Sequence, residues 1–78
     1  MTLDRRSWID RFASELGVDP PTDGQVEALL GLAGVAAHAS ERSAAPVSCW
    51  IAAVAGVDPQ TAHARATALA ERLAAQDD

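Results

Sequence analysis

The amino-acid sequence predicts a single all-α domain, a compact four-helix bundle made of two antiparallel helix pairs. Three observations predict this fold. Apolar residues recur at steps of three and four in four separate segments, no segment alternates with the period of two that marks a strand, and glycine or proline separates the segments. A chain of 78 residues is too short to build two cores, so we expect one domain over residues 1–78.

The first helix is expected over residues 4–16, with Thr2 or Asp4 available to cap it and Gly17 placed to end it in the left-handed conformation. The face predicted to be buried comprises Trp8, Ile9, Phe12, Ala13 and Leu16. The opposite face carries the charges and is predicted to be solvated. Its members are Arg5, Arg6, Asp10, Arg11 and Glu15.

Two prolines after Asp19 make a stiff connector, because each lacks a backbone donor and restricts the residue before it. The second helix is expected over residues 23–38, capped by Thr22 or Asp23. Its predicted buried stripe comprises Val26, Leu29, Leu30, Ala33 and Ala37, with Leu32 and Val35 off the stripe. Gly31 and Gly34 are costly inside a helix, which predicts that another helix packs close to them.

Residues 39–45 show the weakest periodicity and are predicted to form the longest loop. Pro46 then suits the first position of a third helix, which Gly56 ends. The face of that helix comprises Val47, Trp50, Ile51 and Val54. Asp58 and Pro59 signal the start of a fourth helix that runs to about residue 75. Its buried stripe is predicted to comprise Ala62, Ala66, Leu69, Ala70 and Leu73.

The charge distribution argues against nucleic acid as a partner. The formal net charge is −5, lysine is absent, and the six arginines are scattered among eleven acidic residues. A phosphate backbone needs a continuous positive face. The apolar residues are mainly alanines, so the core should be thin, and a protein partner or self-association would add the missing burial.

The residues that carry chemistry do not assemble into a recognisable catalytic or metal motif. His38, Cys49 and His63 are not spaced as zinc ligands, and Cys49 among apolar neighbours fits a small hydrophobe better than a nucleophile with His38 as its base. No phosphate-binding loop, dinucleotide fingerprint or paired carboxylates occur. We therefore expect a non-enzymatic domain without a cofactor or metal.

His38 and Arg42 are one helical turn apart and lead into the loop before Pro46, and two interpretations of them stay open. In the first, His38 caps the carbonyls that end the second helix and Arg42 pairs with Glu41 or another acid. In the second, His38, Arg42 and Trp50 form a patch that binds a partner, because arginine and tryptophan dominate interface hot spots. Trp8 and Trp50 are both expected in the core, and exposure of either would favour an interface.

The chain begins without the apolar stretch of a signal peptide and has no window long enough to span a membrane, so the cytoplasm is the expected location and no membrane partner is expected. The single cysteine also rules out an intramolecular disulfide.

Several short motifs, taken in order, resemble a small actinobacterial all-helical domain family of unknown function, found alone or fused to proteins similar to molybdenum cofactor guanylyltransferase. The motifs are Leu3 with Trp8-Ile9, Leu16-Gly17-Val18, Leu29-Leu30 with Leu32-Ala33, Val35 to His38 followed by Arg42 and Ala44-Ala45-Pro46, Ala52 to Gly56, and Ala68 to Ala70. The resemblance implies an accessory domain linked to molybdopterin-guanine dinucleotide biosynthesis, with no assigned catalytic residues. Ser48-Cys49-Trp50 departs from the aliphatic or phenylalanine stretch expected there.

Two functional hypotheses follow. One is an interaction module that docks on a molybdenum cofactor enzyme or on itself, through the surface around His38, Arg42 and Trp50. The other is a small-ligand carrier or chaperone, in which the second and third helices enclose a cleft lined by His38, Arg42 and Cys49 for an anionic pterin or nucleotide. A DNA-binding helix-turn-helix is disfavoured, because the last helix carries only Arg65 and Arg72 as cations.

Overall fold

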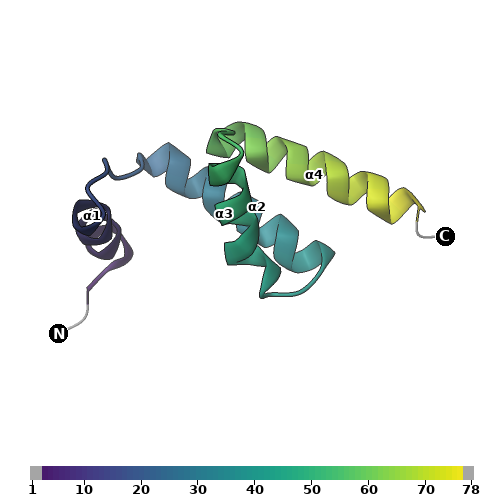
Figure 1. The fold of residues 1–78 in the computed structure, drawn as a ribbon. Helices are drawn as coiled ribbons and strands as arrows, with labels where there is room; N and C mark the ends of the chain where they lie inside the picture. The colour runs from purple at the N-terminus through teal and green to yellow at the C-terminus, as the bar shows by residue number, and fades with distance from the viewer. Residues whose placement is uncertain (1–2, 77–78) are drawn as a thin grey trace.

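The computed structural model describes residues 3–76, which form four helices in chain order (Figure 1). The helices are α1 (Arg5–Glu15), α2 (Asp23–Ala39), α3 (Ala44–Val54) and α4 (Pro59–Gln76). No strand occurs in this range, so the predicted all-α bundle of four helices is confirmed. Across residues 3–76, every helix falls short of the length and apolar character that crossing a membrane requires.

The second helix is the centre of the fold, because it packs against both α3 and α4. In Figure 1, α3 crosses α2, α4 runs alongside α2 in the same direction, and α1 lies at the N-terminal end of α2. The core is thin, and three of its five buried apolar residues are alanines. These five residues are Ala13, Val26, Ala28, Leu32 and Ala62.

The side of α2 that is buried differs from the predicted stripe. Leu32, expected off the stripe, is the most buried residue of the core at 4% exposure, whereas Leu30, expected within it, is 46% exposed. A single apolar stripe is typical of a helix that packs against one neighbouring element. Because α2 is contacted by two helices, the buried surface covers more of its circumference and its centre shifts towards Leu32.

Side-chain caps fix where three of the helices begin. The Asp4 carboxylate accepts a hydrogen bond from the Ser7 amide at 2.7 Å, so Asp4 is the cap of α1, and Thr2 lies outside the described residues. Thr22 caps α2 in a capping box with Gln25. Asp58 accepts from the Thr61 amide at 2.9 Å at the start of α4. These contacts satisfy backbone donors that have no partner inside a helix.

Two glycines end helices as predicted. Gly17 after α1 and Gly56 after α3 both have φ of 72°, in the left-handed region that glycine adopts without steric cost. The amide of Val18 donates to the Ala13 carbonyl at 3.0 Å, which completes a Schellman motif, and the amide of Val57 makes the matching bond after α3. The same tetrapeptide, Gly-Val-Asp-Pro, stands at residues 17–20 and 56–59.

The third helix begins earlier than predicted. It starts at Ala44, so Pro46 is its third residue, and the loop expected over residues 39–45 shrinks to a link of four residues, 40–43. The longest link is instead the one between α1 and α2, over residues 16–22. Proline is tolerated throughout the first turn of a helix, because the amides of that turn have no carbonyl partner.

Gly31 is the point of closest approach between α2 and α4. A Cβ built on Gly31 would lie 2.8 Å from both ring nitrogens of His63, whereas a Cβ on Gly34 would meet nothing within 4 Å. The prediction of a close neighbouring helix therefore holds for Gly31 and fails for Gly34. The imidazole of His63 lies against the α2 backbone, and a side chain on Gly31 would displace it.

Alanine substitutions at these two glycines should differ in their effect on stability. Gly34→Ala should raise the free energy of unfolding by about 1 kcal/mol, because alanine is the better helix former and has free space there. Gly31→Ala gains the same propensity but crowds His63, so it should be less stable than Gly34→Ala by about 1–3 kcal/mol. Urea unfolding followed by circular dichroism measures both values. Equal stability of the two variants would contradict the close contact, and His63→Ala should rescue Gly31→Ala.

The cap of α4 predicts a dependence of stability on pH. Hydrogen bonds from the Thr61 backbone and hydroxyl lower the pKa of Asp58 below the usual value for an aspartate. The charged cap therefore stabilises the fold at any pH above the usual pKa of an aspartate. Its contribution is lost as the pH falls through the lowered pKa. Asp58→Ala should melt at a lower temperature than wild type at pH 7, and the difference should shrink below about pH 4. Asp58→Asn, which keeps an acceptor that does not titrate, should melt above Asp58→Ala by an amount that does not change with pH, and thermal unfolding at several pH values checks both variants.

Candidate interaction surface

The outer face of α3 is an uncovered row of large apolar side chains. Val47, Trp50, Ile51 and Val54 are between 55% and 67% exposed, and Trp50 is the most exposed large hydrophobic residue described. The helix contains no charged residue and no buried residue. An amphipathic helix normally turns such a row towards the core. Here the row faces solvent, so it is the main candidate for a binding surface.

The opposite side of α3 is held against α2 through small residues. The thiol of Cys49 lies 3.8 Å from the carbonyl oxygen of Leu29, at the hydrogen-bond limit for sulfur. Partial burial raises the pKa of the Cys49 thiol, which keeps it protonated at neutral pH. A nucleophilic cysteine needs the opposite shift. This environment agrees with the interpretation of Cys49 as a small packing residue.

The first helix meets α2 through its charged side. Arg6 donates to the Pro21 carbonyl at 2.7 Å and to the Asp23 carboxylate at 3.2 Å, and Arg5 pairs with Glu27 at 3.5 Å. Arg5 is exposed, as predicted for the charged side of this helix, whereas Arg6 is partly buried by its contact with the Pro21 carbonyl. The helical pattern did not predict these contacts, because the partners lie at or beyond the two prolines in the sequence.

The aromatic side of α1 is exposed instead of buried. The rings of Trp8 and Phe12 stack with their centroids 5.7 Å apart and nearly parallel, and Leu16 continues the exposed row. The expectation that Trp8 and Trp50 are core residues is wrong for both, since they are 57% and 67% exposed. The physical reason is that α1 meets α2 through its two arginines and α3 meets α2 on the side of Cys49, so the tryptophan-bearing sides of both helices stay uncovered.

The three residues predicted to bind a partner do not all lie on the same element. His38 stands in the last turn of α2, Arg42 in the link before α3, and Trp50 two turns into α3, and all three are exposed. Within residues 3–76, no hydrogen bond or ion pair is found for the side chain of His38 or of Arg42, so neither makes the capping or pairing contact of the first interpretation. Trp50 is grouped with Val47, Ile51 and Val54.

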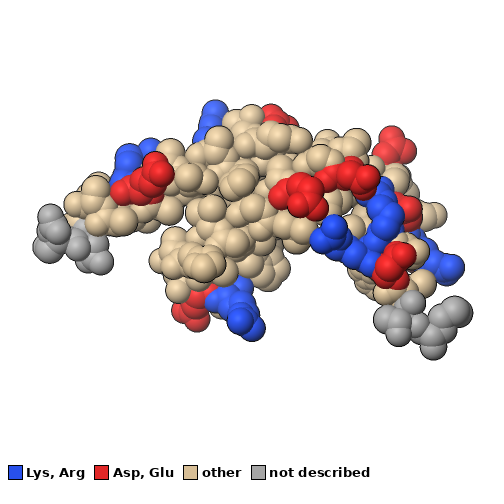
Figure 2. Space-filling model, turned by 180° about the vertical axis from the view of Figure 1, so that it is seen from behind, with Lys and Arg blue, Asp and Glu red and all other residues tan. Residues whose placement is uncertain are grey.

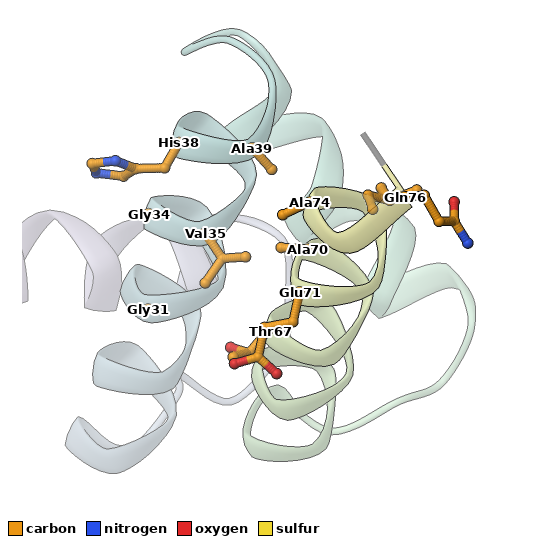
Figure 3. Close-up of a pocket in the computed structure, with 11 residues that line it drawn as sticks. Gly31, Gly34, Val35, His38, Ala39, Thr67, Ala70, Glu71, Ala74 and Gln76 are labelled. Carbon is orange, nitrogen blue, oxygen red and sulfur yellow. The ribbon is translucent and has the colours of Figure 1, made fainter. Parts of the chain in front are cut away.

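A wide groove separates the C-terminal parts of α2 and α4 (Figure 3). It holds about 1010 Å³ and is lined mainly by small and apolar residues, including Gly34, Val35, Ala70 and Leu73. Leu73 is 51% exposed and Leu69 is 46% exposed, so their predicted burial in the fourth helix is wrong. In Figure 3, Val35 and Ala39 face α4, whereas the imidazole of His38 extends away from it.

This groove is not the cleft expected for an anionic ligand. That cleft was predicted between the second and third helices with His38, Arg42 and Cys49 in its lining, but only His38 lines the observed groove, and Glu71 contributes a negative charge. Over residues 3–76, no three potential metal ligands come together, and His63 lies against Gly31.

Charged side chains gather over α1 and the start of α2, as Figure 2 shows, while most of the middle of that face is uncharged. The apolar set on α3 was identified in the sequence but assigned to the core. One available signal was the complete absence of charge from residues 44–54, which leaves no polar side to turn towards solvent. A second signal was the number of large apolar side chains. Helices rich in alanine offer too little surface to bury all of them.

The comparisons with known proteins show a family and add no activity. The family model described as a domain of unknown function, DUF6457, matches residues 3–78. No curated protein and no solved structure matches the chain. Because the match spans nearly the whole sequence, the chain belongs to the DUF6457 family.

Proposed function

We propose that this protein is a non-catalytic interaction domain that works by docking its α3 face on another protein surface. The observation that carries the proposal is the exposure of Val47, Trp50, Ile51 and Val54, each above one half, along one side of a helix without charges. Exposed apolar side chains scattered singly are common, but a continuous row of this kind is typical of interfaces. A tryptophan near its middle is the usual anchor.

Polar residues near the α2–α3 link complete the proposed surface. His38 and Arg42 precede α3 in the chain and are both exposed. Arginine suits the edge of an interface, because its guanidinium donates several hydrogen bonds in a fixed geometry. In this arrangement Trp50 supplies most of the affinity, and Arg42 and His38 orient the partner.

The chemistry of the described residues supports a role without catalysis. The only thiol faces α2 and is held protonated, and the two carboxylates with a shifted pKa, Asp4 and Asp58, are helix caps. Functional carboxylates commonly have a perturbed pKa inside a cleft, but these two are fully exposed and have a structural explanation.

A finer proposal concerns the partner. The resemblance to domains fused to molybdenum cofactor guanylyltransferase-like proteins supports an enzyme of that kind as the surface on which α3 docks. Such an accessory domain would supply binding alone, because this chain has no phosphate-binding loop.

The carrier hypothesis is supported by one observation, the groove between α2 and α4. Its lining is mostly apolar and contains no arginine, so it suits an apolar occupant better than a pterin or nucleotide phosphate. The α3 face is therefore the stronger basis for a function.

Site-specific photo-crosslinking in cells tests the interaction function. A photoreactive amino acid at position 51, on the α3 face, should yield covalent adducts heavier than the 8.1 kDa chain. The matched control is position 65, where Arg65 is exposed on α4, and it should yield few adducts. Equal labelling at both positions, or none at position 51, would contradict an interface on α3.

Isothermal titration calorimetry tests the partner. The purified domain should bind a molybdenum cofactor guanylyltransferase from the same genome, and Trp50→Ser should weaken binding by about 30-fold or more, as loss of a hot-spot tryptophan does. Leu69→Ser, on α4, serves as the control and should leave the affinity unchanged. Heat from guanine nucleotide alone would instead support the carrier function, and no heat with the enzyme would remove the molybdenum link.

A further inference from the structure

We infer that a second copy of this chain covers the α3 face of the free protein, and that two α3 helices pair antiparallel across a two-fold axis. This inference rests on the proposed function and names the partner that covers the α3 face. Three observations carry it, namely the amount of exposed surface, the spacing of the apolar row and the position of the charges.

The single chain exposes more surface than a closed domain of its size. Its accessible surface is 5951 Å², roughly 1,450 Å² more than the ~4,500 Å² expected for a folded monomer of 8.1 kDa. Its radius of gyration is 14.0 Å, against about 11.5 Å for a compact chain of this length. A standard interface buries about 800 Å² of each partner, so the excess is enough for one such contact.

The spacing of the apolar row is the same from either end of the helix. Positions 47, 50, 51 and 54 are separated by three, one and three residues. A two-fold axis that passes between Trp50 and Ile51 therefore places Trp50 of one copy against Ile51 of the other, and Val47 against Val54. Isologous interfaces require a surface of this kind, which is complementary to itself.

The charges do not oppose the pairing. The net charge of −5 would make two copies repel, but no ionisable side chain other than the Cys49 thiol occurs within α3, and that thiol faces α2. The acidic residues nearest in sequence are Glu41 and Asp58, outside both ends of the helix. The contact between two copies would thus remove apolar surface from water without burying a charge.

The full chain, examined by analytical ultracentrifugation over a range of concentrations, should sediment at twice its 8.1 kDa mass at high concentration. Val47→Glu and Val54→Lys, each alone, should raise the dimer dissociation constant by at least about 100-fold, because each buries an unpaired charge. Both substitutions suit the dipole of α3, with the acid near its N-terminus and the base at its C-terminus, so circular dichroism should show unchanged helicity.

Mixing the two single variants tests the register. An antiparallel pair sets position 47 of one copy against position 54 of the other, so an equimolar mixture of Val47→Glu and Val54→Lys should form a dimer where neither variant does alone. The double variant should dimerise for the same reason. The two positions lie about 10 Å apart along one helix, so the new charges cannot neutralise each other within a chain.

Leu73→Glu is the matched control, because Leu73 is an exposed apolar residue in the α2–α4 groove and not on α3. It should leave dimerisation unchanged. A wild-type chain that stays monomeric at millimolar concentration would overturn the inference, as would a dimer that Leu73→Glu dissociates and the α3 variants do not. A failure to restore the dimer by mixing would overturn the antiparallel arrangement.

These results are separable from the proposed function. A monomeric chain whose position 51 still crosslinks to a different protein would overturn the second copy as partner and leave the interaction function standing. A chain that neither dimerises nor forms crosslinked adducts at position 51 would remove both.

Discussion

The contact between the His63 imidazole and the Gly31 backbone sets the position of α4 on α2. Only glycine leaves room for the ring there, since a Cβ would overlap it. On the N-terminal side of this contact lie the buried residues Val26, Ala28 and Ala62. On its C-terminal side the two helices border an open groove (Figure 3). One close approach thus separates a packed half of the helix pair from an unfilled half.

The rest of the fold is attached to this pair by small or polar contacts. The third helix rests on α2 through Cys49, and α1 is joined to α2 by two arginines and their carboxylate partners. Exposed ion pairs contribute little to stability, so the position of α1 depends heavily on the bond of Arg6 to the Pro21 carbonyl and on the prolines that stiffen the link. Because neither attachment uses large apolar side chains, those side chains remain on the surface.

This division of the apolar residues has a functional meaning. Alanines and medium-sized residues make the core, whereas Trp8, Phe12, Trp50 and Ile51 face outward. Large apolar side chains gain the most free energy from leaving water, so their exposure lowers the stability of the isolated chain and raises the gain from association. The interaction function that we propose, with contact to a second copy or to an enzyme, rests on this division.

The sequence by itself determined the number and type of the helices, because periodicity, caps and glycine ends are local properties. Asp4, Thr22 and Asp58 begin helices and Gly17 and Gly56 end them through contacts within a few residues of each other. Tertiary structure decided which side of each helix is buried, since an apolar row looks the same whether it meets a core or solvent. The wrong assignments of Trp8, Trp50, Leu30 and Leu73 share this cause. Their burial depends on how much surface the neighbouring helices offer, and each of these four side chains lies on a side of its helix that no neighbour covers.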